Sequence, residues 1–505
     1  MKVLLPLLAA GIALSAAAAN EVYKTSNEGI VYTFADLAKI EGSGVTKTGE
    51  NIYTVEKDIE VPANDGLTLE NNTTLRLGAN VLIKMWGGKH NFAPADTATI
   101  TSNGDGVMPK GIQFTDMDKT IEVKHVRFEG AGVKFGGPAA SIVENCTFYE
   151  HNDKIGHYAI NYAGHSMGNE VRHCYFLRTA MSAIGAGANI AAGVVIEDNI
   201  MEDCSTANRN YPVINETPAA DNGPIIIRRN KILGGKRLMP GAISVSNMLS
   251  MIGDHKVIIE DNYIDNSRYG LNLMGHYMDF RVTGNTILNC HYESNSVNGG
   301  SGVTVYSQSA DNASKVYMSG NRIEGCLWGV TLVGTAVANL GNISVDASSA
   351  DYNPGGNSFK NNGNCGKAPE GAETAFDPSI PYDLYNNTAA TVYAQGNVWG
   401  GADQSDAEVE KRIFHKADDA NLGEVIYKPV GTTSGISVAG EDNFDISVYG
   451  DGAITIEGAA VGTPVSVYDV AGSLLYSGVT DETIQLGRKG LVVVVVGSKA
   501  VRVAL

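Results

Sequence analysis

The sequence predicts an all-β protein, a long β-solenoid followed by a small β-sandwich, and three observations lead to this fold class. Glycine is abundant, with 59 of 505 residues, but it lacks the triplet period of collagen. Only 18% of the residues are charged, because small polar residues take many surface positions. A short motif with β-branched flanks recurs at intervals of about 20 to 40 residues, which is the period of solenoid repeats.

Residues 1–19 have the form of a secretory signal peptide. Lys2 supplies the charged start, an apolar stretch runs from Val3 to Leu14, and small residues precede Asn20. The longest apolar run elsewhere, Leu491–Val496, is far shorter than the roughly 20 residues of a membrane-spanning helix. We therefore expect a protein that is secreted or held at the outer cell surface.

Residues 20–75 lack the repeat and are predicted to form an N-terminal β cap. The segments Ile52–Val61 and Leu67–Leu77 have the pattern of strands, with a turn at Asn64–Gly66 between them. A cap of this kind would cover the strand edges that the first coil leaves unpaired.

The solenoid is predicted over residues 76–430, where Asn or a substitute, then any residue, then an apolar residue recurs. Stacked coils lie about 4.8 Å apart, so equivalent residues form ladders along the axis. An Asn at a tight corner can then bond its neighbours in the coils above and below. The first positions of the motif are Val126, Cys146, Cys174, Asn199, Asn230, Asn262, Asn285, Asn321, Asn357 and Asn397.

A second ladder lies between the copies of this motif, as in Gly270–Leu273 and Gly302–Val305. It has a small residue followed by alternating apolar positions. Each coil therefore has at least two short strands whose alternate residues face the core. The cysteines follow the same register, since Cys146 and Cys174 occupy the Asn position. We expect buried free thiols in preference to disulfides or metal ligands.

With these ladders, the chain resembles the right-handed parallel β-helix repeat proteins over roughly residues 75–430. The resemblance implies about ten coils and a closing C-terminal cap, in which Ser405 and Glu408 have the spacing of a capping box. It does not define an activity, because one such fold hosts unrelated functions.

Residues 436–505, after a glycine-rich linker, are predicted to form the β-sandwich. The blocks Val465–Gly472, Leu475–Gly478 and Gly490–Lys499 resemble the C-terminal sorting domain of the type IX secretion system. This resemblance implies transport across an outer membrane and contact with the secretion machinery. The Leu491–Val496 run departs from the family pattern.

Charge and motifs narrow the possible functions. A net charge of -18, from 37 Lys and Arg against 55 Asp and Glu, speaks against nucleic acid as a partner. The sequence has none of the signatures of β-helix hydrolases and lyases, and no P-loop, H-E-x-x-H or G-x-S-x-G motif. We therefore assign no catalytic residue, no metal and no cofactor.

Against this acidic background, aromatic and basic residues gather around the ends of the second strand ladder. Flat rings can stack on sugar rings, and cations attract carboxylated or sulfated sugars. The candidate substrate-binding residues are Tyr158, Arg209, Tyr211, Glu216, Arg237, Arg268, Tyr269, His276 and Tyr277.

Two functional hypotheses follow. The first is a monomeric surface protein that binds a polysaccharide or cell-surface glycan, acidic in character, along the solenoid without catalysis. The second is a polysaccharide lyase or glycoside hydrolase acting on an acidic glycan. The second hypothesis would need a base such as Arg237, Arg268 or His276, a proton donor such as Tyr269 or Tyr277, and Glu216 as a candidate carboxylate.

Overall fold

The computed structural model divides into two compact units, residues 1–432 and 433–505. It describes residues 20–188, 190–218, 223–249, 251–253, 255–292, 301–363, 382–401 and 403–431, and in the second unit 445–449, 453–457, 462–469, 474–480, 484–486, 491–496 and 499–504. The predicted signal peptide and the predicted glycine-rich linker beyond residue 431 lie outside the described residues.

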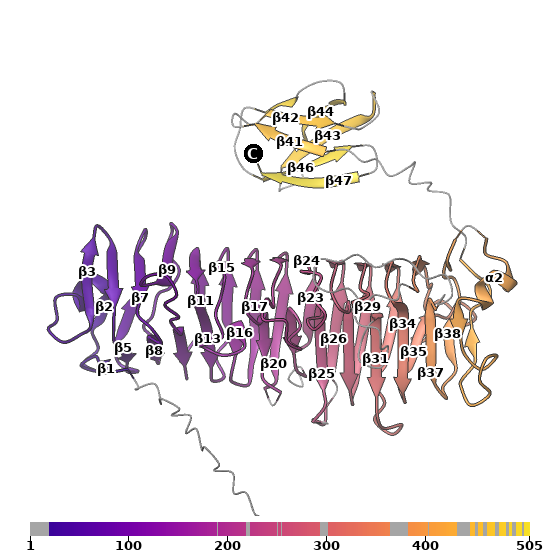
Figure 1. The fold of residues 1–505 in the computed structure, drawn as a ribbon, viewed down its shortest axis with the longest axis horizontal. Helices are drawn as coiled ribbons and strands as arrows, with labels where there is room; N and C mark the ends of the chain where they lie inside the picture. Colours follow the sequence, from indigo (N-terminus) through magenta and orange to yellow (C-terminus); the bar gives the residue numbers. More distant parts are fainter. Residues whose placement is uncertain are drawn as a thin grey trace, which may run out of the picture. The chain divides into compact units, whose positions relative to one another are not determined.

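The first unit is a right-handed parallel β-helix, as predicted. Three long sheets run along it, and each full coil adds one strand to sheet 1, then to sheet 2, then to sheet 3 (Figure 1). Neighbouring strands in these sheets pair in parallel, except that β3 and β4 are antiparallel. Sheet 1 has 14 strands, more than the ten motif copies, because coils near both ends lack the motif.

The strands of the three sheets have the following bounds. Sheet 1 contains β1 (Val22–Lys24), β5 (Asp58–Val61), β8 (Leu82–Trp86), β10 (Gly111–Thr115), β13 (Gly132–Gly136), β16 (Tyr158–Tyr162), β19 (Ser182–Ala186), β22 (Ile214–Glu216), β25 (Ile243–Asn247), β28 (Leu271–Gly275), β31 (Ser301–Ser307), β34 (Trp328–Gly334), β37 (Leu384–Thr388) and β39 (Ile413–Phe414). Sheet 2 contains β11 (Ile121–Lys124), β14 (Ser141–Glu144), β17 (Ser166–Arg172), β20 (Ala192–Glu197), β23 (Ile225–Arg228), β26 (His255–Glu260), β29 (Met278–Thr283), β32 (Lys315–Ser319), β35 (Val337–Gly341), β38 (Val392–Ala394) and β40 (Val425–Ile426). Sheet 3 contains β3 (Val45–Gly49), β4 (Ile52–Val55), β7 (Thr74–Leu77), β9 (Ala98–Ser102), β12 (Val126–Glu129), β15 (Thr147–Tyr149), β18 (Tyr175–Leu177), β21 (Ile200–Glu202), β24 (Lys231–Leu233), β27 (Tyr263–Asp265), β30 (Thr286–Leu288), β33 (Arg322–Glu324) and β36 (Ser358–Lys360).

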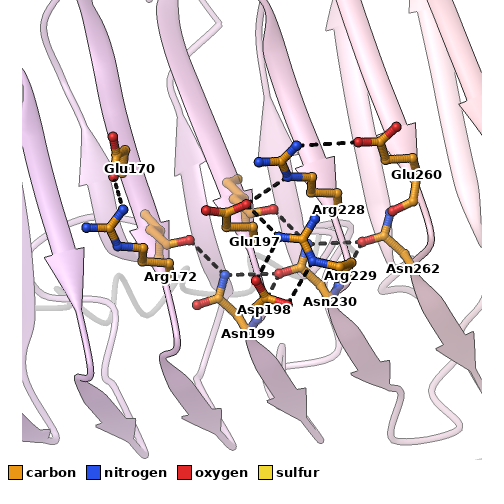
Figure 2. A network of polar contacts seen from close by, with 12 residues as sticks. Glu170, Arg172, Glu197, Asp198, Asn199, Arg228, Arg229, Asn230, Glu260 and Asn262 are labelled. Carbon is orange, nitrogen blue, oxygen red and sulfur yellow. Dashed lines mark hydrogen bonds and ion pairs between the residues drawn. The ribbon is translucent and has the colours of Figure 1, made fainter. Parts of the chain in front are cut away.

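An asparagine ladder at a tight corner was predicted, and the structure places it at the corner between sheets 2 and 3. Each side-chain oxygen accepts from the backbone and side-chain amides of the Asn one coil earlier. Asn262, for example, accepts both bonds from Asn230 at 3.0 Å, and its own amide donates to Asn285 at 2.9 Å. The chain of bonds continues through to Asn397 (Figure 2 shows Asn199, Asn230 and Asn262). The ladder thus satisfies buried amides that the corner takes out of the sheets.

The residue before each ladder position makes the turn. It has a left-handed backbone, with φ of 56° at Asp198 and 55° at Asp261, and glycine takes this place at Gly284, with φ of 65°. Asp and Gly both tolerate this conformation, which explains their presence directly before the ladder.

Next to the ladder, charged residues alternate in sign at one outward register position of sheet 2. Arg172 donates to Glu144 at 3.1 Å, and Arg228 donates to Glu197 at 2.7 Å (Figure 2 shows the latter pair). Arg172 and Glu197 are register neighbours. These pairs are partly exposed, so each adds little stability, but opposite charges on adjacent strands favour the native register.

The core contains the predicted apolar ladders. The rings of Phe128, Phe148 and Phe176 stack with centroids 4.8 and 4.9 Å apart. Small residues open the strands of sheet 1 because space is short there: a side chain at Gly270 would meet Ile287 at 2.5 Å. The five described cysteines are free and buried, as expected, and Cys365 lies outside the described residues.

Further elements lie at the two ends of the solenoid. At the N-terminus lie the two-stranded sheet of β2 (Val31–Thr33) and β6 (Gly66–Thr68) and the helix α1 (Phe34–Leu37), where Thr33 and Asp36 form a capping box. β1 and β5 already belong to sheet 1, so parallel stacking begins before residue 76. At the other end, α2 (Asp406–Glu410) follows Ser405, whose side chain makes no cap bond, so the predicted capping box does not form.

The second unit contains two antiparallel sheets. Their apolar side chains, among them Val465, Ile484 and Val494, form one separate core. The strands are β41 (Asp445–Tyr449), β42 (Ala453–Glu457) and β45 (Ile484–Gln485) in one sheet, and β44 (Leu474–Val479), β43 (Pro464–Asp469), β46 (Leu491–Val496) and β47 (Lys499–Ala504) in the other. None of the described helices has the length and apolar character to cross a bilayer.

Candidate functional site

Six of the nine candidate residues lie where the chain enters sheet 1 from sheet 3. This entry turn recurs in every coil, so residues far apart in the sequence are brought to one edge of sheet 1. Tyr158 begins β16, and the other five lie in the turns before β22, β25 and β28, namely Arg209, Tyr211, Arg237, Arg268 and Tyr269.

Beside this edge, polar side chains form a column on the outward face of sheet 1, which we call the polar column. It consists of Asn161, Asn215, Ser244, Asn272 and Thr304, with Gly185 between the first two. The parallel register places these residues side by side on successive strands. At about 4.8 Å per coil, the amide and hydroxyl groups form a regular row. Asn215 and Asn272 are partly exposed in this row, whereas Asn161, Ser244 and Thr304 are buried.

Tyr158 covers part of this column. A side chain at Gly185 would overlap its ring, so the glycine leaves the space that the ring fills. The Tyr158 hydroxyl donates to the carbonyl of Ala186 at 3.1 Å and accepts from the Asn215 amide at 3.1 Å. Burial raises the pKa of Tyr158 to about 12, which keeps the hydroxyl protonated at neutral pH.

Tyr269 has the equivalent role two coils after Asn215. Its ring occupies the space beside Gly241, and its hydroxyl lies next to Ser244 and Asn272, two residues of the polar column. Burial raises its pKa to about 12, against the opposing effect of the nearby Arg268 charge. The Arg268 guanidinium lies 5.6 Å from the ring centroid and donates to the side chain of Asn210 at 2.9 Å.

These positions correct the expected role of four candidates. Tyr158, Tyr269, Arg237 and Arg268 are each less than a tenth exposed. Their rings and guanidinium groups therefore cannot stack on a sugar in this conformation, because the turns fold back over them. The side chains support the floor of the face, and Arg237 is also paired with Asp203.

Arg209 and Tyr211 remain accessible at the rim of the site. Arg209 is exposed, and Tyr211 is half-buried with its ring centroid 4.8 Å from that of His157. No described residue forms an ion pair with Arg209. These two residues can therefore meet a ligand that lies along the polar column.

Glu216 lies inside the solenoid, which excludes it from a surface groove. It is two residues after the buried Ile214, so both side chains face inward, and it is fully buried beside Val245 of the next strand. Neither carboxyl oxygen has a hydrogen-bond partner among the described residues. Burial raises its pKa to about 8. The alternation Ile214, Asn215, Glu216 already carried the signal for this inward position.

His276 and Tyr277 lie at the opposite end of β28, where the chain leaves sheet 1. The sequence from Tyr269 to His276 spans β28 and corresponds to roughly 23 Å of extended chain at about 3.3 Å per residue. His276 is buried, whereas Tyr277 is half-buried and lines a separate pocket. They do not belong to the entry site.

Sequence reasoning overlooked the polar column itself. Asn215, Ser244 and Asn272 each stand between two buried residues, which are apolar except for Glu216, and this alternation is visible in the sequence. Within the described part of the chain, no group of three or more His, Cys, Asp or Glu side chains is placed to hold a metal ion.

The fold and this surface define a right-handed parallel β-helix protein with a polar outward face. No protein-family model and no curated protein matches the chain. Among solved structures, the periplasmic alginate epimerase AlgG is similar at 10% identity and a TM-score of 0.36, over 61% of this chain and 82% of that chain. The Dettilon tailspike protein is similar at 12% identity and a TM-score of 0.20, over 61% of this chain and 59% of the other. Likenesses this weak carry no argument about activity.

Proposed function

We propose that the protein binds an acidic polysaccharide along the polar column of sheet 1, outside the cytoplasm and without catalysis. The observation that carries this proposal is the register alignment of Asn215, Ser244 and Asn272 beside two buried tyrosines, with the side chains of Asn215 and Asn272 partly exposed. A repeating row of donors and acceptors suits a ligand that is itself a chain of repeating hydroxylated units.

Local charge supports an acidic ligand. The chain as a whole is acidic, so a polyanion would be repelled from most of its surface. At the rim of the column, however, Arg209 is exposed and Arg268 lies just beneath the surface. The positive charge of these two arginines would attract the carboxylate or sulfate groups of the ligand.

Replacing Arg209 or Tyr211 with Ala is expected to lower affinity for polygalacturonate or alginate oligosaccharides by about threefold to tenfold. Each substitution removes one ligand-facing group while leaving the buried floor intact. Isothermal titration calorimetry on the full chain measures the effect, and added salt should weaken wild-type binding more than Arg209→Ala binding.

The matched control is Arg322→Ala, which removes an exposed arginine from β33 on sheet 3. It should bind as the wild type does. Equal losses in Arg322→Ala and Arg209→Ala would indicate a nonspecific charge effect and would refute binding along the polar column.

A lyase acting on the same glycan is the second candidate, and one contact favours it. The Arg268 guanidinium lies 5.6 Å from the centre of the Tyr269 ring, which places a cation for a uronate beside a phenol. Both side chains are buried, so this candidate requires the entry turns to move before a uronate can reach them. The hydrolase form of this candidate loses its carboxylate, since Glu216 faces the core. Unsaturated uronate products, detected by ultraviolet absorbance and lost in Tyr269→Phe, would establish the lyase in place of binding alone.

We further propose that residues 436–505 act as a sorting domain recognised by a type IX secretion machinery. The three blocks that resemble this family support the proposal. In a host with this system, the full chain should reach the cell surface or medium, whereas a chain ending at residue 435 should stay in the periplasm. Surface delivery of the truncated chain would contradict it.

A further inference from the structure

A pocket lies where the chain leaves sheet 1, at the opposite end of the strands from the entry turns. Its volume is about 700 Å³, within the range of about 300 to 1,000 Å³ that is usual for ligand pockets. The lining residues used below are Ile252, Tyr277, Asp279, Asp311, Lys315 and Val337.

Tyr277 lines this pocket with an unfavourable backbone conformation. Its φ is 60°, which a bulky side chain rarely adopts, and it is the one tyrosine among the described residues with positive φ. Its amide donates to the Asn312 carbonyl at 3.0 Å, and its carbonyl accepts from the His255 amide at 3.2 Å. Backbone strain of this kind concentrates at ligand-binding sites, where the surrounding structure holds it in place.

The opposite wall of the pocket is also fixed. The Ser314 amide donates to the Ser307 hydroxyl at 3.1 Å, and the Ser314 hydroxyl donates to the Gly275 carbonyl at 3.0 Å. An isolated bridge joins His276 and Ala313. The segment that carries Asp311 is therefore held against the end of β28, so the pocket exists before a ligand arrives.

The polar groups in the pocket are available to a ligand. Asp279 and Lys315 are register neighbours on β29 and β32, and Asp311 is exposed nearby. None of the three has an ion-pair partner among the described residues. Two carboxylates against one ammonium disfavour an anionic ligand but offer acceptors for hydroxyl groups.

Apolar surface completes the site. Ile252 is 80% exposed and Val337 is 40% exposed, both unusually high for large apolar side chains. With the Tyr277 ring, they provide flat apolar surface beside the carboxylates. A pyranose ring has the matching character, an apolar face with hydroxyl groups around its edge.

We propose that this pocket binds a neutral saccharide unit, with the Tyr277 ring against the sugar face and Asp279, Asp311 and Lys315 bonded to its hydroxyl groups. The site and the ligand class both differ from those of the polar column. The protein would then bind an acidic chain along the polar column and a neutral sugar at the exit end of the strands of sheet 1.

Calorimetric titration of the full chain with cellohexaose, xylohexaose and mannohexaose tests this proposal. At least one of these neutral probes should bind, and Tyr277→Asn should weaken binding at least tenfold. Asn tolerates the left-handed backbone, so this variant removes the ring without adding strain and should fold as well as the wild type. Asp279→Asn combined with Asp311→Asn should also weaken binding, because amides accept fewer hydroxyl bonds than carboxylates.

Tyr393→Ala is the matched control, since Tyr393 is an exposed tyrosine of sheet 2 that does not line the pocket. It should leave affinity unchanged. No binding by any neutral probe, or wild-type affinity in Tyr277→Asn, would overturn the proposal. Tyr211→Ala separates the two sites: it should reduce acidic binding only, so failure of one proposal leaves the other measurable.

Discussion

Raising the pH from about 5 to about 9 is expected to destabilise the solenoid by several kcal/mol, and Glu216→Gln is expected to remove most of this dependence. Burial raises the pKa of Glu216 from 4.5 to about 8. The neutral carboxyl is thus favoured in the folded state. The folded protein therefore has the full stability that this carboxyl contributes below about pH 4.5, the pKa of Glu216 in the unfolded chain. This stability is lost as the pH rises from there to about 8, the pKa in the folded chain. At about 1.4 kcal/mol per unit, the loss is on the order of 5 kcal/mol.

The groups around Glu216 do not neutralise its charge. The nearby Tyr158 and Tyr162 hydroxyls are themselves raised in pKa by burial and by the Glu216 charge, and no described cation contacts the carboxyl. Gln keeps the shape and stays neutral at every pH. Its variant should therefore be more stable than the wild type above about pH 8, by several kcal/mol.

Two other buried groups, Asp383 and His151, also make the free energy of unfolding depend on pH. Burial raises the pKa of Asp383 to about 7, so its contribution is also lost as the pH rises. Burial lowers the pKa of His151 to about 3, so its contribution is lost in the other direction, as the pH falls below about 6.5. Above about pH 4.5 the two carboxyl groups lose stability with rising pH faster than His151 gains it, so these three groups together place the greatest stability near about pH 4 to 4.5.

Urea midpoints at about pH 5, 7 and 9 measure these changes, with the exposed Glu50→Gln as control. The control should reproduce the wild-type slope. If Glu216→Gln also follows that slope, the carboxyl is ionised in the folded protein and its interior environment is not apolar.

The asparagine ladder is the site of the second large expected effect. Asn262→Ala should lower the free energy of unfolding by roughly 3 to 5 kcal/mol. The substitution leaves the Asn230 amides without their acceptor, and it leaves the Ile227 carbonyl without the donor that reaches it at 2.8 Å. Each buried group left unsatisfied accounts for about 1 to 3 kcal/mol.

Urea unfolding measures this loss, and Lys231→Ala, an exposed substitution one residue after the ladder, is the control. Hydrogen exchange should also quicken first in β24, β27 and β30, the strands nearest the gap. A loss below about 1 kcal/mol would mean that water replaces the amide and that the ladder is not a dry network.

The fold could be predicted from the sequence because each parallel coil places equivalent residues in the same environment as the coils beside it. Asn199 through Asn397 hold one corner, and residues such as Ile214 and Leu271 alternate with outward neighbours, so local pattern and global structure agree. The inward position of Glu216 followed from the same alternation. Its charged residue type suggested a surface carboxylate, whereas its position two residues after Ile214 indicates a buried one.

The surface proposed for binding was less predictable, because residues in turns do not alternate between an inward and an outward side as strand residues do. The sequence placed Tyr158, Tyr269 and Arg268 correctly at the entry edge, but their directions depend on how each turn folds over its neighbours. Gly185 and Gly241 leave space for the tyrosine rings, and that complementarity between different coils exists only in three dimensions. The sequence by itself thus determined the coil, its ladders and the edge of sheet 1 on which six of the candidate residues lie. Only the tertiary structure decided which side chains are buried there, because burial at a corner depends on packing between coils.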